Sequence, residues 1–313
     1  TMNILVTGGA GYIGTLLTKK LLNLNHKVIV LDTFWFGNHL PNHKNLRIIK
    51  KDILNIKERD LGKIDVVYHL ASVANDAASM LDTKLTWEIS CQGTLNLCNI
   101  CKKLKVKKFI FASSGSVYGI KKEKRVTENL SLKPISDYNK TKMIAEKVIE
   151  SFSPFFKIYL VRPGTVFGYS PRMRLDLMIN ILTFHALQKK KITVFGGSQT
   201  RPFIHIQDMT DLYLHFLNKN LRSGIYNASS GNLTANKTAI EIKKLINCKI
   251  IKKKSNDPRS YRLSSEKIKK KRFKFNWDLK KGVLELIEKF NEKKILNKKE
   301  YYFINLIKKY KKI

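Results

Sequence analysis

Short apolar runs alternate with segments of helical periodicity over the first 165 residues, and this alternation constrains the fold more than any other feature. Compact apolar runs predict strands buried on both faces of a sheet, at Ile4–Thr7, Val28–Leu31, Arg47–Lys50, Val66–Leu70, Phe109–Ser113 and Ile158–Arg162. Helices are predicted between them at Tyr12–Leu24, Leu81–Lys103 and Asp137–Ser151. Repeated β-α-β units place parallel strands side by side with helices on both faces. The predicted fold class is therefore α/β, with a doubly wound parallel sheet.

A glycine-rich loop, TGGAGYIG at residues 7–14, connects the first predicted strand to the first predicted helix. Its glycines at 8, 11 and 14 let the chain turn tightly, bring its backbone close to a pyrophosphate and pack the helix against the strand. The amide groups and the positive dipole end of that helix favour phosphate binding. The loop predicts a dinucleotide site with contacts from Gly8, Gly11, Tyr12, Ile13 and Gly14.

Asp32 ends the second predicted strand, 18 residues after Gly14. A carboxylate at this place accepts hydrogen bonds from both ribose hydroxyls of NAD and repels the 2′-phosphate of NADP. We therefore expect a Rossmann-type site for NAD. The alternative is an ordinary strand–helix turn followed by a surface aspartate.

Tyr138 and Lys142 stand four residues apart in the predicted helix Asp137–Ser151, so they share one helix face. An ammonium beside a phenol favours the phenolate, which can remove a proton from a sugar or alcohol hydroxyl. The pair alone is common on protein surfaces. It gains weight from residues 111–119, FASSGSVYG, where a predicted buried strand ends in hydroxyl side chains.

Together, these segments resemble the extended short-chain dehydrogenases/reductases, specifically the NAD-dependent nucleotide-sugar epimerase/dehydratase family. The matching motifs cover nearly the whole chain in the family's order: TGGAGYIG at 7–14, Asp32, KDI at 51–53, HLAS at 69–72, SSGSVYG at 113–119, YNKTK at 138–142, VRPGTVFG at 161–168 and RPFIHIQD at 201–208. The resemblance implies NAD as the cofactor and a nucleotide sugar as the substrate.

The resemblance also implies roles for individual residues. Ser114 would share the substrate proton, Tyr138 would be the base, and Lys142 would lower the pKa of the tyrosine and bind the cofactor ribose. The remaining cofactor contacts would be Asp52 and Ile53 at the adenine, and the backbone of Leu70, Ala71, Ser72 and Pro163. The substrate contacts would include Ser114, Ser116, Thr165, Arg201 and Arg259, with the two guanidinium groups on the diphosphate.

The chain departs from the family's dehydratases at the proton-transfer positions. Those enzymes have a Thr-Asp-Glu sequence before the VYG motif and the decarboxylases keep the Glu, whereas this chain has Ser114, Gly115 and Ser116. Without the carboxylate pair, elimination lacks a proton carrier, and redox chemistry at one carbinol remains. The departure favours a 4-epimerase or a simple 4-dehydrogenase over a 4,6-dehydratase or a decarboxylase. Thr165 and Ser90 also depart from the family, since many members have Asn there.

Residues 169–177, YSPRMRLDL, are similar to a loop in members that act on surface-polysaccharide precursors, including GDP-heptose 4-dehydrogenases. On this interpretation Arg172 and Arg174 contact phosphate or sugar hydroxyls of the substrate. The alternative is a capped helix start at Ser170-Pro171 with both arginines in solvent.

The alternation of strands and helices ends near residue 165. The remaining predicted elements are helices at Asp176–Lys189, Asp208–Asn218, Thr238–Leu245 and Lys280–Glu292, and strands at Ile192–Phe195 and Gly224–Ala228. We expect residues 1–165 to form the NAD-binding domain, with segments near 202–230 returning to it. Residues 166–313 would form a smaller α/β domain for the nucleotide sugar, ending in a Lys-rich segment with a peripheral helix.

The formal net charge of +36 is the most unusual property of the composition. Nucleic acid or an anionic surface is one explanation. However, Lys, Ile and Asn are all abundant, as in AT-biased coding, and the lysines cluster at 249–254, 267–274 and 305–312 rather than in one stripe with aromatic residues. We favour solvated lysine surfaces and do not expect nucleic acid as a partner.

The sequence shows no sign of a metal site, a membrane span or a secretory signal. Cys98 and Cys101 are spaced as one buried helix face, and no second Cys or His pair has zinc spacing. No uncharged apolar run approaches the length of a transmembrane helix, and the first strand begins without a basic leader. A cytoplasmic protein is expected.

Three functions remain open from the sequence. The first is an NAD-dependent 4-epimerase, and the second is a 4-dehydrogenase that releases a 4-keto sugar. The third, of another class, is a basic NAD-binding interaction protein, although such a protein has no need of Ser114, Tyr138 and Lys142. The family resemblance also implies a homodimer through the helices Leu81–Lys103 and Asp137–Ser151, with Leu95, Leu97, Ile144 and Val148 as apolar contacts.

Overall fold

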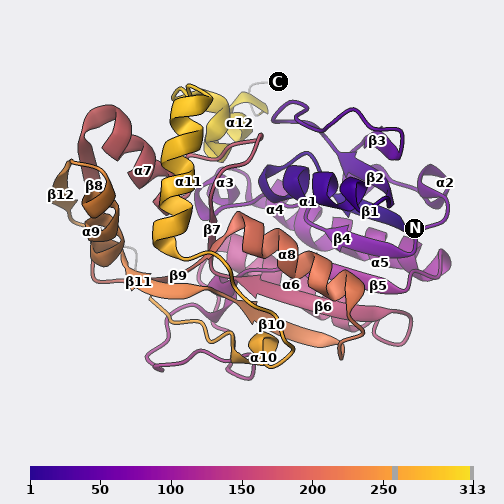
Figure 1. Ribbon diagram of the computed structural model, residues 1–313. Helices are drawn as coiled ribbons and strands as arrows, with labels where there is room; N and C mark the ends of the chain where they lie inside the picture. Colours follow the sequence, from indigo (N-terminus) through magenta and orange to yellow (C-terminus); the bar gives the residue numbers. More distant parts are fainter. Residues whose placement is uncertain (256–259, 311–313) are drawn as a thin grey trace.

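A seven-stranded parallel sheet forms the centre of the protein (Figure 1). The structure is a computed structural model and describes residues 1–255 and 260–310. The strand order is β10-β6-β5-β4-β1-β2-β3, and every neighbouring pair is parallel. The strands are β1 (Asn3–Thr7), β2 (Lys27–Asp32), β3 (Leu46–Lys50), β4 (Val66–His69), β5 (Lys108–Ala112), β6 (Lys157–Pro163) and β10 (Gly224–Ala228). This arrangement confirms the predicted doubly wound, Rossmann-type α/β fold.

Helices cover both faces of this sheet because alternate strand residues point to opposite sides. In β1, Ile4 and Val6 belong to one buried cluster, whereas Leu5 belongs to the other. The first cluster includes apolar residues of α1 (Tyr12–Asn23) and α8 (Ile206–Asn218). The second includes those of α5 (Gly93–Lys103) and α6 (Asp137–Glu150). The segment that returns to the main sheet after residue 165 consists of α8 and β10, with β10 pairing along β6.

One predicted helix is wrong at its start. The sequence predicts a single helix over Leu81–Lys103. In the structure a separate helix ends at Leu81, and helical geometry is interrupted at Asp82, whose φ of −147° is not helical. The Asp82 side chain accepts a hydrogen bond from the Leu85 amide at 2.9 Å and so caps the helix that follows. The segments are α3 (Asp76–Leu81), α4 (Thr83–Trp87), a π-helical stretch (Glu88–Gln92) and α5. Cys98 and Cys101 are buried in α5, which confirms the helix-face interpretation.

The second half of the chain adds a smaller mixed α/β layer beside the carboxyl ends of the main strands (Figure 1). Its strands are β7 (Thr165–Phe167), β9 (Thr200–His205) and β11 (Gly231–Thr234) in one sheet, and β8 (Lys191–Phe195) and β12 (Lys249–Lys253) in another. Its helices are α7 (Met178–Lys189), α9 (Ala235–Leu245), α10 (Glu266–Lys269), α11 (Leu279–Glu292) and α12 (Phe303–Tyr310). One further short helix, α2 (Glu58–Leu61), lies in the first half.

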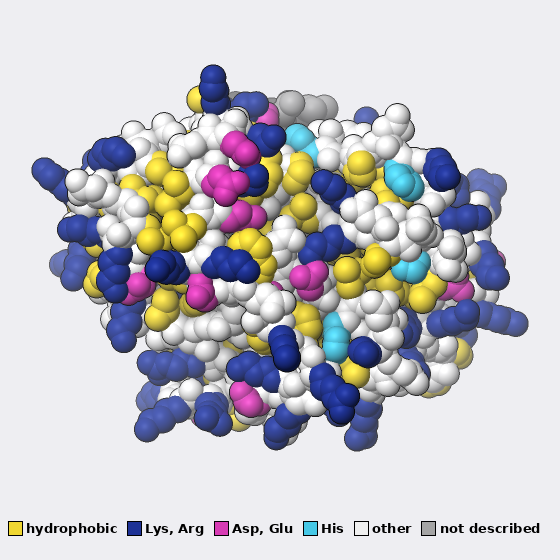
Figure 2. Space-filling view, in the orientation of Figure 1, with side chains coloured by type: hydrophobic (Ala, Val, Ile, Leu, Met, Phe, Trp, Pro, Cys, Tyr) yellow, Lys and Arg dark blue, Asp and Glu magenta, His cyan; other side chains and the backbone are white. Residues whose placement is uncertain are grey.

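Lysine and arginine side chains are spread over the face of the molecule shown in Figure 2, with acidic and apolar side chains between them. Within the described ranges, none of the helices is long and apolar enough to cross a membrane. The same residues contain no group of three His, Cys, Asp or Glu side chains placed to hold a metal ion.

Candidate active site

A cavity of about 440 Å³ opens at the carboxyl ends of the central strands, where parallel sheets of this type bind ligands. Every described residue that the sequence predicted for a site lines it: Gly8, Gly11, Tyr12, Ile13, Gly14, Asp32, Asp52, Ile53, Leu70, Ala71, Ser72, Ser114, Ser116, Tyr138, Lys142, Pro163, Thr165, Arg172, Arg174 and Arg201. The remaining one, Arg259, lies outside the described residues. Residues far apart in the sequence therefore meet at one cavity.

The glycine-rich loop has no room for a side chain at Gly8 or Gly14. Gly8 has a φ of +70°, and a Cβ on it would lie 2.7 Å from the Ala71 nitrogen. A Cβ on Gly14 would lie 2.3 Å from the Gly8 carbonyl oxygen. The N-terminus of α1 has no side-chain cap, so its first amide groups are free of a capping oxygen at the cavity. The loop therefore fits a bound phosphate group at this helix end.

Asp32 is held at the end of β2 by backbone amides. Its oxygens accept hydrogen bonds from Ala10 N at 3.0 Å and Phe34 N at 2.8 Å. Burial raises the pKa of its carboxyl above the usual value, while these amides and Arg172 act in the opposite direction. The carboxylate lines the cavity beside the glycine-rich loop, a place that suits the hydroxyls of an adenosine ribose.

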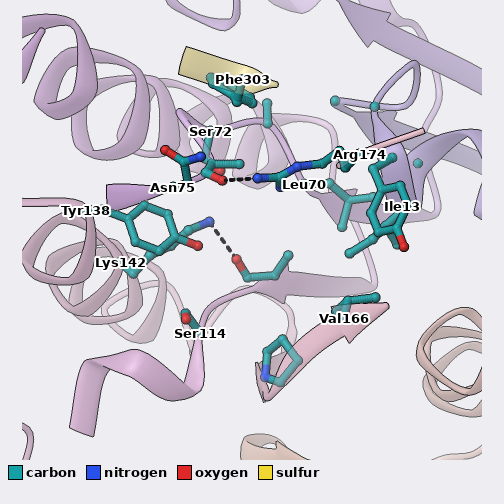
Figure 3. A pocket seen from close by; sticks show the side chains of 18 of the residues that line it. Ile13, Leu70, Ser72, Asn75, Ser114, Tyr138, Lys142, Val166, Arg174 and Phe303 are labelled. Atoms are coloured by element: carbon teal, nitrogen blue, oxygen red, sulfur yellow. Dashed lines mark hydrogen bonds between the residues drawn. The ribbon is translucent and has the colours of Figure 1, made fainter. Parts of the chain in front are cut away.

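Lys142 lies under Tyr138 on the inner face of α6. Figure 3 shows both side chains on the same side of the cavity as Ser114, opposite Ile13, Leu70 and Arg174. The Lys142 Nζ lies 5.9 Å from the centre of the Tyr138 ring and donates to the Ala112 carbonyl oxygen at 2.7 Å. Burial lowers the pKa of Lys142 to about 7, and Glu146 and Cys91 oppose this shift. The site thus places an amine that is partly protonated near pH 7 next to a phenol, the combination expected for a tyrosine base.

The Ser114 hydroxyl belongs to a short chain of hydrogen bonds. The Ser116 hydroxyl donates to Asn139 Oδ1, so in the 2.6 Å contact between the two serine oxygens Ser114 is the donor. Ser114 Oγ also accepts the Ser116 amide at 3.2 Å, which leaves one lone pair to accept a substrate hydroxyl proton in a hydrogen bond. Ser114 lies at the N-cap of a short 3₁₀ helix (Gly115–Tyr118), directly after β5.

Beneath Lys142 lies a buried ionic network that the sequence analysis missed. Arg162 donates from Nε and Nη2 to the two oxygens of Glu146, at 2.8 and 2.5 Å, and both side chains are buried. Ser113 also donates to Glu146. Glu146 follows Lys142 by one helical turn on α6, and that i, i+4 spacing was the available signal.

The structure of the loop that contains Arg172 and Arg174 excludes the alternative interpretation, in which a helix starts at Ser170-Pro171 and both arginines lie in solvent. No helix begins at Ser170-Pro171, since α7 starts at Met178, and the Ser170 hydroxyl donates to the Tyr12 carbonyl oxygen at 2.8 Å. Arg172 and Arg174 are both buried and line the cavity. Asp176 was predicted to begin the helix, but its carboxylate instead pairs with Arg174 through two 2.8 Å hydrogen bonds.

Other cavity residues were not predicted. Asp76, Asp176, Phe36, Tyr261 and Phe303 line the cavity as well. No local motif marks Phe303, because α12 reaches the cavity only through tertiary packing near the end of the described chain.

Comparison with known proteins gives one consistent result. Residues 4–229 match the model of the NAD dependent epimerase/dehydratase family. The chain is 36% identical over 221 residues to an uncharacterised UDP-glucose epimerase, YtcB, of Bacillus subtilis, covering 66% of this chain and 70% of that protein. It is 30% identical over 243 residues to a putative UDP-glucose 4-epimerase of Methanocaldococcus jannaschii, covering 74% and 78% of the two chains.

Solved structures agree with these relatives. The UDP-glucuronic acid 4-epimerase of Bacillus cereus, in complex with UDP-glucuronic acid and NAD, superposes with a TM-score of 0.81 at 28% identity. The superposition covers 93% of this chain and 99% of that one. UDP-glucuronic acid decarboxylases and a dTDP-D-glucose 4,6-dehydratase are also among the similar proteins, so similarity alone does not select one reaction.

Proposed function

The chain belongs to the NAD-dependent epimerase/dehydratase family, and from this premise we propose that it is a nucleotide-sugar 4-epimerase acting by transient oxidation at C4. We assign residues 1–165, together with α8 and β10, to cofactor binding, and the rest of the second half to the nucleotide sugar. A cytoplasmic location is part of the same proposal.

The observation that carries this proposal is the state of the carboxylates around the cavity. Elimination or decarboxylation requires a free acid beside the sugar, but Gly115 and Ser116 stand where the family's dehydratases have Asp and Glu. The aspartates lining the cavity all have other partners. Asp32 and Asp52 accept backbone amides, Asp76 accepts the Ser136 hydroxyl, and Asp176 pairs with Arg174. Redox chemistry at one carbinol needs none of them.

Three side chains would act on the sugar. Tyr138, as phenolate, removes the proton of the C4 hydroxyl and later returns it. Ser114 Oγ is a second acceptor beside Tyr138 and shares the hydrogen bond of that one proton, which orients the C4 hydroxyl for transfer. The Lys142 ammonium favours the phenolate. NAD, when bound, supplies the acceptor and donor of the C4 hydride.

Arg201 would hold the diphosphate of the nucleotide. It follows Thr200 at the start of β9 and lines the cavity together with Thr165, whose strand β7 pairs with β9. A guanidinium there matches the geometry of phosphate oxygens. Arg259 keeps the same proposed role.

A homodimer would use the outer faces of α5 and α6. Leu95 and Ile144 are 45% and 36% exposed, so they are available to a partner. Leu97, which the sequence grouped with them, is fully buried against its own chain and cannot serve. Val148 is half-buried.

The proposal is tested by incubating the protein with NAD and a panel of UDP-, GDP-, dTDP- and CDP-sugars, with products followed by mass and cofactor absorbance. A 4-epimerase forms an isomer of unchanged mass and accumulates no NADH. Loss of two hydrogens with NADH build-up identifies the 4-dehydrogenase instead, and loss of water or CO₂ refutes both. Tyr138→Phe, which keeps the ring, serves as the inactive control.

A further inference from the structure

Arg172 is a buried cation whose hydrogen bonds are incomplete. Its side chain is 2% exposed and lines the cavity, yet Nε and Nη2 have no hydrogen-bond partner among the described residues. Its Nη1 donates to the Met173 carbonyl oxygen at 3.1 Å. Two residues later, by contrast, Arg174 donates from Nε and Nη2 to the two carboxylate oxygens of Asp176. A buried guanidinium in the state of Arg172 is costly unless an anion joins it.

The glycine-rich loop lies directly beside this arginine. The Ser170 hydroxyl donates to the Tyr12 carbonyl oxygen at 2.8 Å, and the Tyr12 hydroxyl donates to the Gly168 carbonyl oxygen at 2.6 Å. These bonds connect residues 168–170, which lead into Arg172, to Tyr12 in the first turn of α1. The uncapped amides of that turn suit a phosphate. Burial and Arg174 lower the pKa of Arg172 to about 9, whereas Asp176 and Asp32 stabilise its charge.

The C-terminal segment, defined here as residues 299–305, packs against the same arginine through a pair of tilted aromatic rings. The Arg172 guanidinium lies 3.5 Å from the centre of the Phe36 ring, and the Phe36 and Phe303 ring centres are 4.9 Å apart. Figure 3 shows Phe303 at the rim of the cavity, above Arg174.

Backbone hydrogen bonds fix the C-terminal segment in this position. The Phe303 amide donates to Asp176 at 3.2 Å, and the Leu175 amide donates to the Tyr301 carbonyl oxygen at 3.0 Å. Phe303 itself is 5% exposed. The segment therefore forms part of the cavity wall and is not a free tail.

We propose that Arg172 binds the diphosphate of the cofactor, and that the C-terminal segment holds Phe36 and Arg172 in place for it. The ligand chemistry is a nucleoside diphosphate, and the ADP half of NAD is the source that fits, because Asp32 and the glycine-rich loop line the same cavity as Arg172 and the Asp32 carboxylate stabilises its charge. This assignment differs from the substrate role that the sequence suggested for Arg172. The inference rests on the family's cofactor and is independent of the reaction at the sugar.

Calorimetric titration of the full chain with ADP and with adenosine tests the role of Arg172. Arg172→Gln is expected to weaken ADP binding about 10- to 100-fold, the range for losing a charge-assisted hydrogen-bond pair, and to leave adenosine binding unchanged. Arg125→Gln, at an exposed arginine, is the matched control. Unchanged ADP affinity in a folded Arg172→Gln protein overturns the proposal. So does selective loss of affinity for a uridine, guanosine or thymidine diphosphate, which would place Arg172 at the substrate.

Phe303→Ala tests the role of the C-terminal segment. It is expected to weaken ADP binding about 3- to 10-fold, since the Phe36–Phe303 contact that supports Arg172 is lost, and to speed NADH dissociation in stopped-flow fluorescence. Phe303→Leu should recover part of the affinity. Phe155→Ala, at a phenylalanine that is 48% exposed, is the control. ADP affinity and NADH dissociation equal to wild type in Phe303→Ala overturn this half of the proposal. Because neither measurement needs a sugar substrate, failure here and failure of the epimerase proposal are distinguishable.

Discussion

Replacing Lys142 by Met is expected to stabilise the cofactor-free protein while removing its activity. The Lys142 side chain is 3% exposed, and its Nζ donates a hydrogen bond to the Ala112 carbonyl oxygen at 2.7 Å. Burial lowers its pKa from 10.5 to about 7, although Glu146 and Cys91 oppose the shift. One pKa unit corresponds to about 1.4 kcal/mol, so keeping this ammonium buried costs up to about 5 kcal/mol of folding free energy. On the proposed mechanism, this cost keeps a cation beside Tyr138.

Methionine has a chain of similar length without the charge. It forgoes the hydrogen bond to Ala112, worth about 1 kcal/mol, and leaves that carbonyl unpaired. At pH 7 we therefore expect Lys142→Met to raise the free energy of unfolding by about 2–4 kcal/mol.

The sign of the pH dependence follows from the proton balance. Between pH 7 and 10.5 the unfolded chain binds a proton on Lys142 that the native chain does not bind, so wild-type stability rises with pH. The advantage of Lys142→Met should accordingly be full below pH 7 and vanish as the pH approaches 10.5.

Urea unfolding of both proteins without cofactor, at several values between about pH 6 and 10, measures this difference directly. Lys140→Met, at an exposed lysine of the same helix, should show neither the gain nor its pH dependence. A Lys142→Met protein that is less stable at pH 7, or a difference independent of pH, would refute the reasoning.

Other consequences concern ligand binding and assembly. Asp32→Ala should weaken NAD binding about 10- to 100-fold and reduce discrimination against NADP, as measured by fluorescence titration with NADH and NADPH. Unchanged NAD affinity would exclude the contact between Asp32 and the ribose. Arg201→Ala should raise the KM of the nucleotide sugar about tenfold with little change in kcat, because a diphosphate contact holds ground and transition states alike; a collapsed kcat at normal KM would instead place Arg201 in the chemistry. Sedimentation at micromolar concentration should show a dimer for the wild type and a monomer for Leu95→Asp/Ile144→Asp, and a wild-type monomer would remove the dimer proposal.

The main sheet was predictable because its signals are local. Most strands from β1 to β6 are compact apolar runs, and the glycines of the first loop are required by a backbone approach that excludes a Cβ, as at Gly14. The exception is β3, which was predicted to be buried on both faces but is an edge strand with three exposed residues. The carboxyl ends of parallel strands meet at one edge, which is why residues from eight separate motifs line one cavity.

The errors arose where tertiary contacts decide local structure. Asp82 ends one helix and caps the next, although the apolar periodicity continues through it. Asp176 pairs with Arg174 and does not begin α7, which starts two residues later at Met178. β12 was hidden in a Lys-rich segment, since its pairing with β8, and not its composition, makes it a strand. The contact between the Phe36 and Phe303 rings joins residues from opposite ends of the chain, which periodicity cannot predict.

The central claim is that Tyr138 serves a reversible oxidation at C4 in which the same hydride returns to the sugar. The most direct test uses whichever nucleotide sugar the panel identifies, deuterated at C4 and incubated with NAD and the wild-type protein. Nuclear magnetic resonance should show the C4 epimer with its deuterium retained, and Tyr138→Phe should slow its formation by about 100-fold or more while still binding NAD. Deuterium released into free NADH, a product that has lost water, or near-normal turnover by Tyr138→Phe would contradict the claim.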